Sequence, residues 1–314
     1  MNIFVTTFES VIVLLGIGFL GFWVIRKKLI PGNIIGLLSP LALDIALPSF
    51  IFVNIIQNFN PKEASDWWTL PLWWLLFVVI AGCLTLLSMF ISKKDIRSEF
   101  GASLFFQNGI FFPLAIIAGM FGDDSDYLVY LFLFTLFYPA FFFSTHQLFY
   151  GKKKLKLSWK KIFHPVLFAT LLAISVRLGN LQGHIPDFFI SILTLLGGMT
   201  IPIIMIILGG NIYVDFQKKG KIFTHEIIKF VLLKNIIYPL VFLLIIILIR
   251  PPYPIALILL LQSAVPPVTA VPLLTERAGG NRLIVNQFIV ASFIMSLLTI
   301  PVMVFFFSTF FAAP

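Results

Sequence analysis

Long apolar runs separated by short polar segments make up almost the whole sequence. A helix needs about 20 apolar residues to span the hydrocarbon core of a membrane, and ten stretches approach or exceed that length. They lie at residues 4–25, 33–57, 69–91, 98–120, 127–150, 162–179, 187–211, 224–249, 254–277 and 283–311. The pattern therefore predicts an all-α polytopic membrane protein with ten transmembrane helices.

Composition strengthens this prediction and narrows the function classes. The 314 residues are 60% hydrophobic and 11% charged, whereas soluble domains are about 25% charged. Cys83 is the only cysteine, which excludes a disulfide framework and a cysteine-based metal site. The net charge of +9 comes from short basic runs between apolar segments, so it indicates membrane topology and not nucleic-acid binding.

The basic residues fall mainly on one side of the predicted spans. The loops after the odd-numbered spans hold 17 Lys and Arg residues, against 3 in the other loops. Loops rich in Lys and Arg stay in the cytoplasm, so we expect both termini to lie outside. The segment before the first span has no basic residue, and a cleaved signal peptide is therefore not expected.

The two halves of the chain resemble each other weakly. At an offset of 155 residues Gln107 matches Gln262, and at an offset of 154 Pro48 matches Pro202. Because each unit has five spans, an odd number, the second copy must be inverted in the membrane, as in many secondary transporters. The predicted division is a first repeat at 1–150, a basic cytoplasmic loop at 151–161 and a second repeat at 162–314.

Spans 4 and 9 contain residues that are poor choices for a continuous helix in lipid. They read "QNGIFFP" and "QSAVPPVTAVP", and proline removes a backbone donor and clashes with a continuing helix. Irregular backbone at this depth must line a cavity or be buried in protein, and a new helix start favours an anion. The candidate substrate-binding residues are Gln107, Asn108, Gly109, Pro113, Gln262, Ser263, Pro266 and Thr269.

These two segments also have a purely structural interpretation. Proline kinks with polar residues that join neighbouring helices would give the same composition. We favour a transport site because the two interrupted spans occupy corresponding positions in the two halves, which is the best sequence indicator of such a site.

Two charged residues inside the spans are candidates for ion coupling. Asp44 lies about 16 Å into span 2, a depth at which charges are rare and usually functional. It could carry a coupling proton, line a water-filled vestibule, or pair with Lys234 of span 8. Lys234 itself could reach the cytoplasmic surface with its long side chain or contact substrate. No metal-ligand spacing and no catalytic motif are present, so no metal, cofactor or catalytic residue is expected.

Four segments together resemble the auxin efflux carrier family, and the resemblance covers essentially the whole chain. They are "GFWVIRKKLIPGNIIGLLSPLALDIALPSFIF", "QNGIFFPLAIIAGMFG", "LGGMTIPIIMIILGGNIY" and "QSAVPPVTAVPLLTERAGGNRLIVNQFIVASFIMSLLTIPVM". The resemblance implies two inverted five-helix repeats with broken, crossing helices 4 and 9. On it, Asn108 matches the crossover asparagine that contacts the substrate carboxylate, and Pro113 matches the proline that follows.

The function implied is secondary transport of a small organic anion by alternating access, and the bacterial members of the family look like permeases for acids such as malate or malonate. The expected location is a bacterial cytoplasmic membrane, with coupling to protons or sodium left open. An efflux carrier for auxin or another aromatic acid is an alternative, and a membrane-embedded enzyme or sensor is a second one. The expected partners are the anion and the bilayer, with no nucleic acid, and the sequence leaves open whether the chain forms a homodimer.

Overall fold

The computed structural model describes residues 3–32, 34–151, 164–217 and 221–312. Within these ranges the fold is all-helical, as expected, and no β-strand is formed. Nearly all of the loop predicted at 151–161 lies outside the described residues. Seven helical stretches in the described part are long and apolar enough to cross a bilayer, so the chain is an integral membrane protein.

The seven long stretches run over Phe4–Arg26, Ile34–Asn58, Trp67–Ile91, Asp126–Tyr150, Asp187–Val214, Thr224–Ile249 and Arg282–Phe310. Three further apolar helices are shorter, namely Phe111–Phe121, Pro165–Leu178 and Tyr253–Ala264. Two of these three belong to the spans that the sequence predicts to be interrupted.

The helices of the first half, in chain order, are α1 (Ile3–Arg26), α2 (Ile34–Pro40), α3 (Leu47–Asn58), α4 (Leu70–Ser88), α5 (Arg97–Phe105), α6 (Phe111–Phe121), α7 (Asp126–Phe134) and α8 (Tyr138–Thr145). A short 3₁₀ segment, η5 (His146–Tyr150), continues α8.

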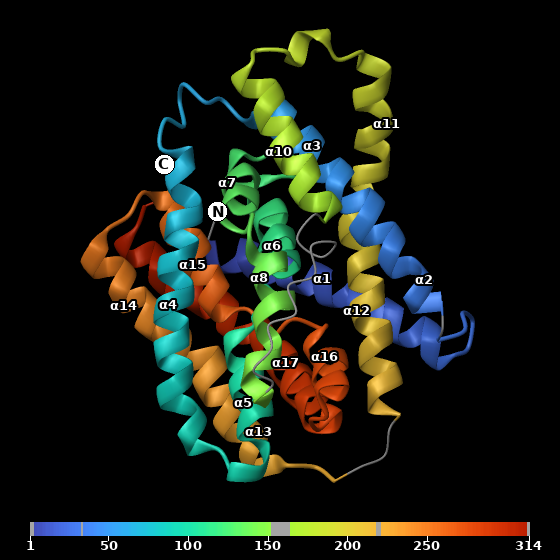
Figure 1. Cartoon of the computed structure of the whole chain (residues 1–314), viewed down its shortest axis with the longest axis vertical. Helices are drawn as coiled ribbons and strands as arrows, with labels where there is room; N and C mark the ends of the chain where they lie inside the picture. The colour runs from blue at the N-terminus through green and yellow to red at the C-terminus, as the bar shows by residue number, and fades with distance from the viewer. Residues whose placement is uncertain (1–2, 33, 152–163, 218–220, 313–314) are drawn as a thin grey trace.

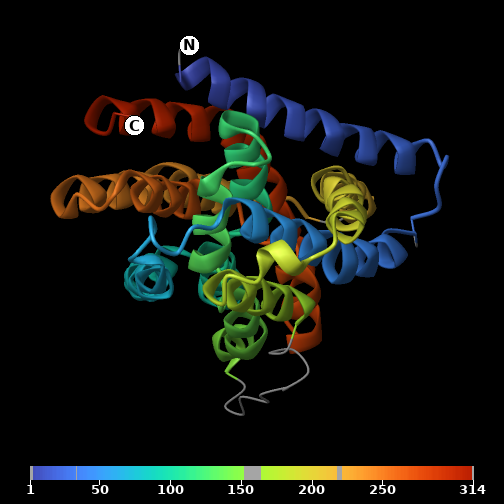
Figure 2. The same ribbon diagram turned by 90° about the horizontal axis from the view of Figure 1, so that it is seen from above.

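The helices of the second half are α10 (Pro165–Leu178), α11 (Asp187–Gly198), α12 (Thr200–Phe216), α13 (Thr224–Val231), α14 (Tyr238–Ile249), α15 (Tyr253–Ala264), α16 (Val271–Ala278) and α17 (Arg282–Phe310). In Figure 1, α6, α8 and α16 lie near the middle of the molecule, between α4 and α14 on one side and α2 and α12 on the other. Figure 2 shows α1 beside α17 at one face, and the two helices pack on each other.

Two membrane helices contain a single wide turn of π-helix just before a proline. Between α2 and α3 it covers Leu41–Ala46, and between α13 and α14 it covers Leu232–Ile237. Pro48 and Pro239 have no N–H to donate, so the preceding N–H groups bond one residue further back, to the carbonyls of Ala42 and Leu233. Both π-turns carry a charged residue, Asp44 in the first and Lys234 in the second.

The crossing of α1 and α12 depends on glycine. A side chain at Gly209 would begin 1.6 Å from the carbonyl oxygen of Gly18, and one at Gly21 would begin 2.3 Å from that of Ile206. Only hydrogen fits in this space, so the two backbones approach each other as in other membrane helix pairs with small residues at the interface. The close contact fixes α12 against α1 along one wall of the cavity described below.

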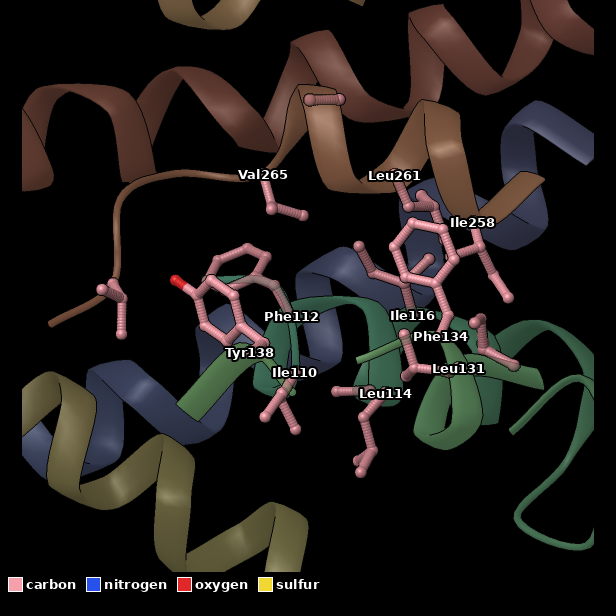
Figure 3. Packing of buried hydrophobic residues seen from close by; sticks show 14 of the residues in the cluster. Ile110, Phe112, Leu114, Ile116, Leu131, Phe134, Tyr138, Ile258, Leu261 and Val265 are labelled. Carbon is pink, nitrogen blue, oxygen red and sulfur yellow. The ribbon is translucent and has the colours of Figure 1, made fainter. Parts of the chain in front are cut away.

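The apolar core surrounds the interrupted helices. Phe112, Ile116, Phe134, Ile258 and Leu261 all have 3% or less of their surface exposed, and Figure 3 shows them converging from α6, α7 and α15. Lipid offers apolar side chains no hydrophobic advantage over protein, so this close packing supplies dispersion contacts that hold the two halves of the chain together.

Candidate functional site

Two irregular segments, 106–110 and 265–270, lie side by side at the centre of the molecule. The first separates α5 from α6 and the second separates α15 from α16. The N–H of Asn108 donates to the carbonyl of Pro266 at 2.8 Å, and the N–H of Val268 donates to that of Phe106 at 3.0 Å. Gln107 and Pro267 thus face each other in an isolated antiparallel bridge. Each segment thus supplies hydrogen-bond partners for backbone N–H and C=O groups of the other, as buried polar groups require.

The prolines of the two segments have different positions. Pro266 and Pro267 follow directly after α15 and cannot continue it, because they have no N–H and their rings clash with the preceding turn. Pro113 instead occupies the first turn of α6, where a missing N–H costs nothing. Pro113 is buried and is not among the residues that line the cavity. Its assignment as a substrate contact stays a prediction.

The two matching glutamines bind each other. Gln107 Nε2 donates to Gln262 Oε1 at 3.1 Å, and Gln262 Nε2 donates to the carbonyl of Gly109 at 2.6 Å. A Cβ at residue 109 would lie 2.4 Å from Gln262 Oε1, so glycine is the residue that lets this amide approach. Both glutamines are at most 2% exposed. They join the two segments, and a direct contact with substrate stays a prediction.

Tyr138 completes this set of contacts from a third direction. Its hydroxyl donates to the carbonyl of Gln107, and Figure 3 shows the ring near Ile110 and Phe112, at the start of α6. Tyr138 is the first residue of α8, followed by Pro139. The sequence analysis did not single it out, because a tyrosine at the start of a helix carries no distinctive pattern.

Asn108 differs from its neighbours because its side-chain amide oxygen makes no hydrogen bond to the other described residues. Its side chain is 3% exposed, and Oδ1 has no hydrogen-bond partner among the described residues. The matching Ser263 donates to the carbonyl of Leu260 at 2.6 Å and does not line the cavity. Burying an amide group without a partner is costly, so Asn108 is the polar group most suited to a ligand.

A cavity of about 660 Å³ opens beside Asn108. It runs between the two interrupted helices, α2 with its π-turn, α8 and α12. Its aromatic walls are Phe111, Tyr138, Phe142 and Phe143, and its polar or basic groups are Ser39, Asn108, His164, Asn211, Thr269, Arg277 and Arg282. Thr269 is thus placed at the cavity, whereas Gly109 and Pro266 are not among its lining residues, and their contact with substrate stays a prediction.

The two coupling candidates lie in different environments. Asp44 is exposed and its Oδ1 is 3.7 Å from Nε2 of His164, which lines the cavity. Lys234 is 1% exposed, with its Nζ 5.5 Å from the ring of Tyr238. In the described part of the chain no ion pair joins the two, and Asp44 lies beside His164 instead, so neutralisation of Asp44 by Lys234 stays a prediction. Lys234 is buried and does not reach the surface in this structure. The coupling roles of both residues stay predictions.

His164 was missed as a partner because it is distant in sequence and precedes a helix. Its Nδ1 accepts the N–H of Val166 at 3.3 Å and caps α10. A ring nitrogen that accepts cannot carry the proton of a neutral imidazole, so Nε2 carries it and points that N–H towards Asp44. No motif in the sequence places these two residues together.

The comparisons with known proteins agree with this architecture. Comparison with curated proteins gives no match. A family model described as "Membrane transport protein" matches the chain twice, at residues 6–157 and 152–304. The two matches divide the chain into two repeats that meet near its middle. The chain is therefore a multi-pass member of the membrane transport protein family, the auxin efflux carrier family that its sequence resembles.

Proposed function

We propose that the protein is a secondary transporter that moves an organic anion across the membrane by alternating access, with Asn108 as its main polar contact. The observation that carries the proposal is the side-chain amide of Asn108, buried at the wall of a 660 Å³ cavity where two helices are interrupted, with an oxygen that has no hydrogen-bond partner among the described residues. The amide can donate through its NH₂ group to a carboxylate and accept through Oδ1 from a hydroxyl or a protonated acid.

The surroundings of Asn108 favour negative charge. α6 and α16 both begin beside the cavity, and the free N–H groups and positive dipole end of a helix start attract anions. Arg277, Arg282 and His164 line the same cavity. These groups would draw a carboxylate towards the interrupted helices, and no carboxylate side chain of the described residues lines this cavity.

A second, smaller cavity supports alternating access. It measures about 420 Å³ and is lined by Glu9, Ser10, Phe50 and Asp123 among others. The two cavities share no lining residue. The larger one uses residues next to the basic loops, and the smaller one uses residues next to the loops poor in Lys and Arg. We infer that the larger cavity faces the cytoplasm and the smaller one the outside.

The topology belongs to the same proposal. The chain has ten spans if the segments that contain the three shorter apolar helices also cross the membrane. With ten spans and the basic loops inside, both termini lie outside and the two repeats are inverted. The domain division at 1–150, 151–161 and 162–314 is part of it. Labelling of Lys154→Cys from inside and of Lys62→Cys from outside, in a Cys83→Ser background, tests the orientation. Labelling of Lys154→Cys from outside in intact cells contradicts it.

The cavity leaves two candidate substrate classes. A small acid such as malate or malonate fits the family resemblance. An aromatic acid fits the size of the cavity, which lies in the range that holds drug-sized ligands, about 300–1,000 Å³, and the walls made by Phe111, Phe142 and Phe143. Both classes present a carboxylate to Asn108, so the contact that carries the proposal is common to them.

Uptake into proteoliposomes tests the function directly. Radiolabelled malate, malonate and indole-3-acetate would each be offered under imposed proton, sodium and voltage gradients. We expect saturable flux of at least one acid, reduced in Asn108→Ala. Chemical conversion of an acid without flux would instead support a membrane-embedded enzyme.

A further inference from the structure

A group of buried titratable side chains lies next to Phe106 and is not part of the cavity lining. His146 is 1% exposed, and both of its ring nitrogens have no hydrogen-bond partner among the described residues. Glu99 is 5% exposed and accepts the backbone N–H of Asn281 at 2.7 Å. A buried histidine and a buried carboxylate without a cation are unusual in a membrane protein and indicate function.

Tyr150 lies between these two residues. Its ring centroid is 5.4 Å from that of His146, and its hydroxyl is 2.7 Å from Oγ1 of Thr275 in α16. A Cβ at Gly280 would lie 2.6 Å from Tyr150 Cε1 and 2.8 Å from Glu99 Oε1. The phenol ring and the carboxylate therefore flank the same glycine, and the three side chains form a continuous line from α5 to η5.

The line ends at the interrupted helices. The ring of His146 is 5.6 Å from that of Phe106, and the carbonyl of Phe106 accepts the N–H of Val268 in the second irregular segment. A charge that appears on His146 would interact with the faces of Phe106 and Phe142. It would thus act on the residue that joins the two segments.

Other charged groups on the surrounding elements face elsewhere. Arg97 lies over the ring of Phe90 at 4.8 Å, and Glu276 pairs with Arg282 at 2.7 Å. Arg277 lines the large cavity. The remaining charges on these elements are the exposed Lys93, Lys94 and Asp95. The six lysines at 152–161 lie outside the described residues. Among the described groups, Glu99 is therefore the carboxylate in this line of side chains, and the ring of Tyr150 separates it from His146.

We propose that Glu99, Tyr150 and His146 form a proton-binding site that couples proton movement to the anion transport proposed above, on which this inference rests. The neutral imidazole of His146 takes one proton from hydronium on one side, which breaks an O–H bond and forms an N–H bond, and becomes imidazolium. The release of this proton to water on the other side breaks the N–H bond and forms an O–H bond again. The described residues hold no group of three or more His, Cys, Asp or Glu side chains that could hold a metal ion.

The first test needs no substrate. Purified wild-type protein with ¹⁵N-labelled histidine contains four imidazoles, and the signals of the other three are assigned with His164→Gln, His184→Gln and His225→Gln. We expect the ring-nitrogen shifts of His146 to change as the pH is lowered, because the imidazole must take up a proton in the proposed cycle. In Glu99→Gln the transition should move to lower pH, because a negative charge in the same line of side chains is removed. Shifts of His146 that stay constant over the whole pH range in which the protein remains folded would overturn the proposal.

The second test uses transport of malate, malonate and indole-3-acetate into proteoliposomes. In His146→Gln, accumulation driven by a proton gradient should fall by about tenfold or more, while exchange of internal for external acid continues. His184→Gln is the matched control, because His184 is exposed, and it should behave as wild type. Undiminished proton-driven accumulation in His146→Gln, or accumulation driven by sodium alone, overturns the proposal. If wild type moves none of the acids, the proposed function fails while the titration of His146 still decides this site.

Discussion

The two irregular segments occupy corresponding places in the two repeats but differ in chemistry. The first presents a polar amide: Asn108 has an unpartnered oxygen at the cavity wall. Ser263, which matches Asn108 at the sequence offset of 155, lies in the last turn of α15, just before the second segment, and donates its hydroxyl to its own helix. Pro266 and Pro267 then end this helix, because they lack an N–H and their rings clash with the preceding turn. The interruption thus occurs in both repeats, whereas the proposed ligand-binding amide occurs in one.

This difference teaches that two repeats can share a backbone arrangement and still differ in side-chain chemistry. The paired glutamines are the part that both repeats share, since each amide forms a hydrogen bond to the other repeat. The asymmetric part is Asn108 and the basic side chains of one cavity. The predictions below first disturb what the two segments share and then what distinguishes them.

The largest effect is expected for Gly109→Ala. The new Cβ would lie 2.4 Å from Gln262 Oε1 and would displace the amide that joins the segments. Overpacking of a well-packed core costs about 1–3 kcal/mol, so the melting temperature should fall and transport should be lost. Gly198→Ala is the control, because a Cβ there meets no atom within 4 Å. Equal stability of the two variants would contradict the described packing.

Asn108→Ala comes next and tests the asymmetry itself. A hydrogen bond to a charged group contributes about 1.5–3 kcal/mol, which corresponds to a loss in substrate affinity of roughly 10- to 150-fold. Folding should be retained, because the amide oxygen has no partner among the described residues. Ser263→Ala, at the matching position, should leave affinity close to wild type. A similar loss in both variants would show that the two segments bind substrate symmetrically.

Tyr138→Phe should have an intermediate effect on stability. It removes the hydroxyl that donates to the carbonyl of Gln107 and leaves that carbonyl without this donor, at a cost of about 1–3 kcal/mol. Chemical denaturation measures the change. Combining it with Gln262→Ala gives a double-mutant cycle: contributions that simply add would show that Tyr138 and the glutamine pair stabilise the segments independently.

Asp44→Asn should have the smallest effect. Its carboxylate is exposed and lies 3.7 Å from His164, and exposed ion pairs contribute about 0–1 kcal/mol. Melting temperature and proton-driven accumulation should both stay near wild type. A large loss of accumulation with continued exchange would instead support Asp44 as a coupling residue, as its depth in span 2 predicts.

Much of the fold follows from the sequence, because one-dimensional patterns determine it. Apolar length places the helices, and prolines at 266 and 267 predict the interruption after α15. The candidate site follows less completely from the sequence. Asn108 could be singled out because it is a polar residue in an interrupted span and matches the crossover asparagine of the family resemblance, and its contact with substrate stays a prediction. Tyr138 and His164 could not, since each acts through a contact with a residue that is distant in the sequence, and neither belongs to a motif.

The same limit explains the interpretation of Lys234. Its depth predicts a side chain long enough to reach the surface, but the direction of a side chain depends on the helices packed around it. In the structure Lys234 is buried, with its Nζ beside the ring of Tyr238. A prediction from depth alone cannot include this effect.

The bridge between Gln107 and Pro267 has a consequence for biosynthesis. Its backbone hydrogen bonds join Asn108 to Pro266 and Phe106 to Val268, so the first segment lacks its partner until the ribosome has made the second. At translation speeds of about 5–20 residues per second, this delay is on the order of 10 s. During that interval the nascent first half has backbone donors and acceptors exposed at membrane depth, and the insertion machinery or a chaperone must shield them. Separately expressed halves should therefore accumulate only when both are produced together.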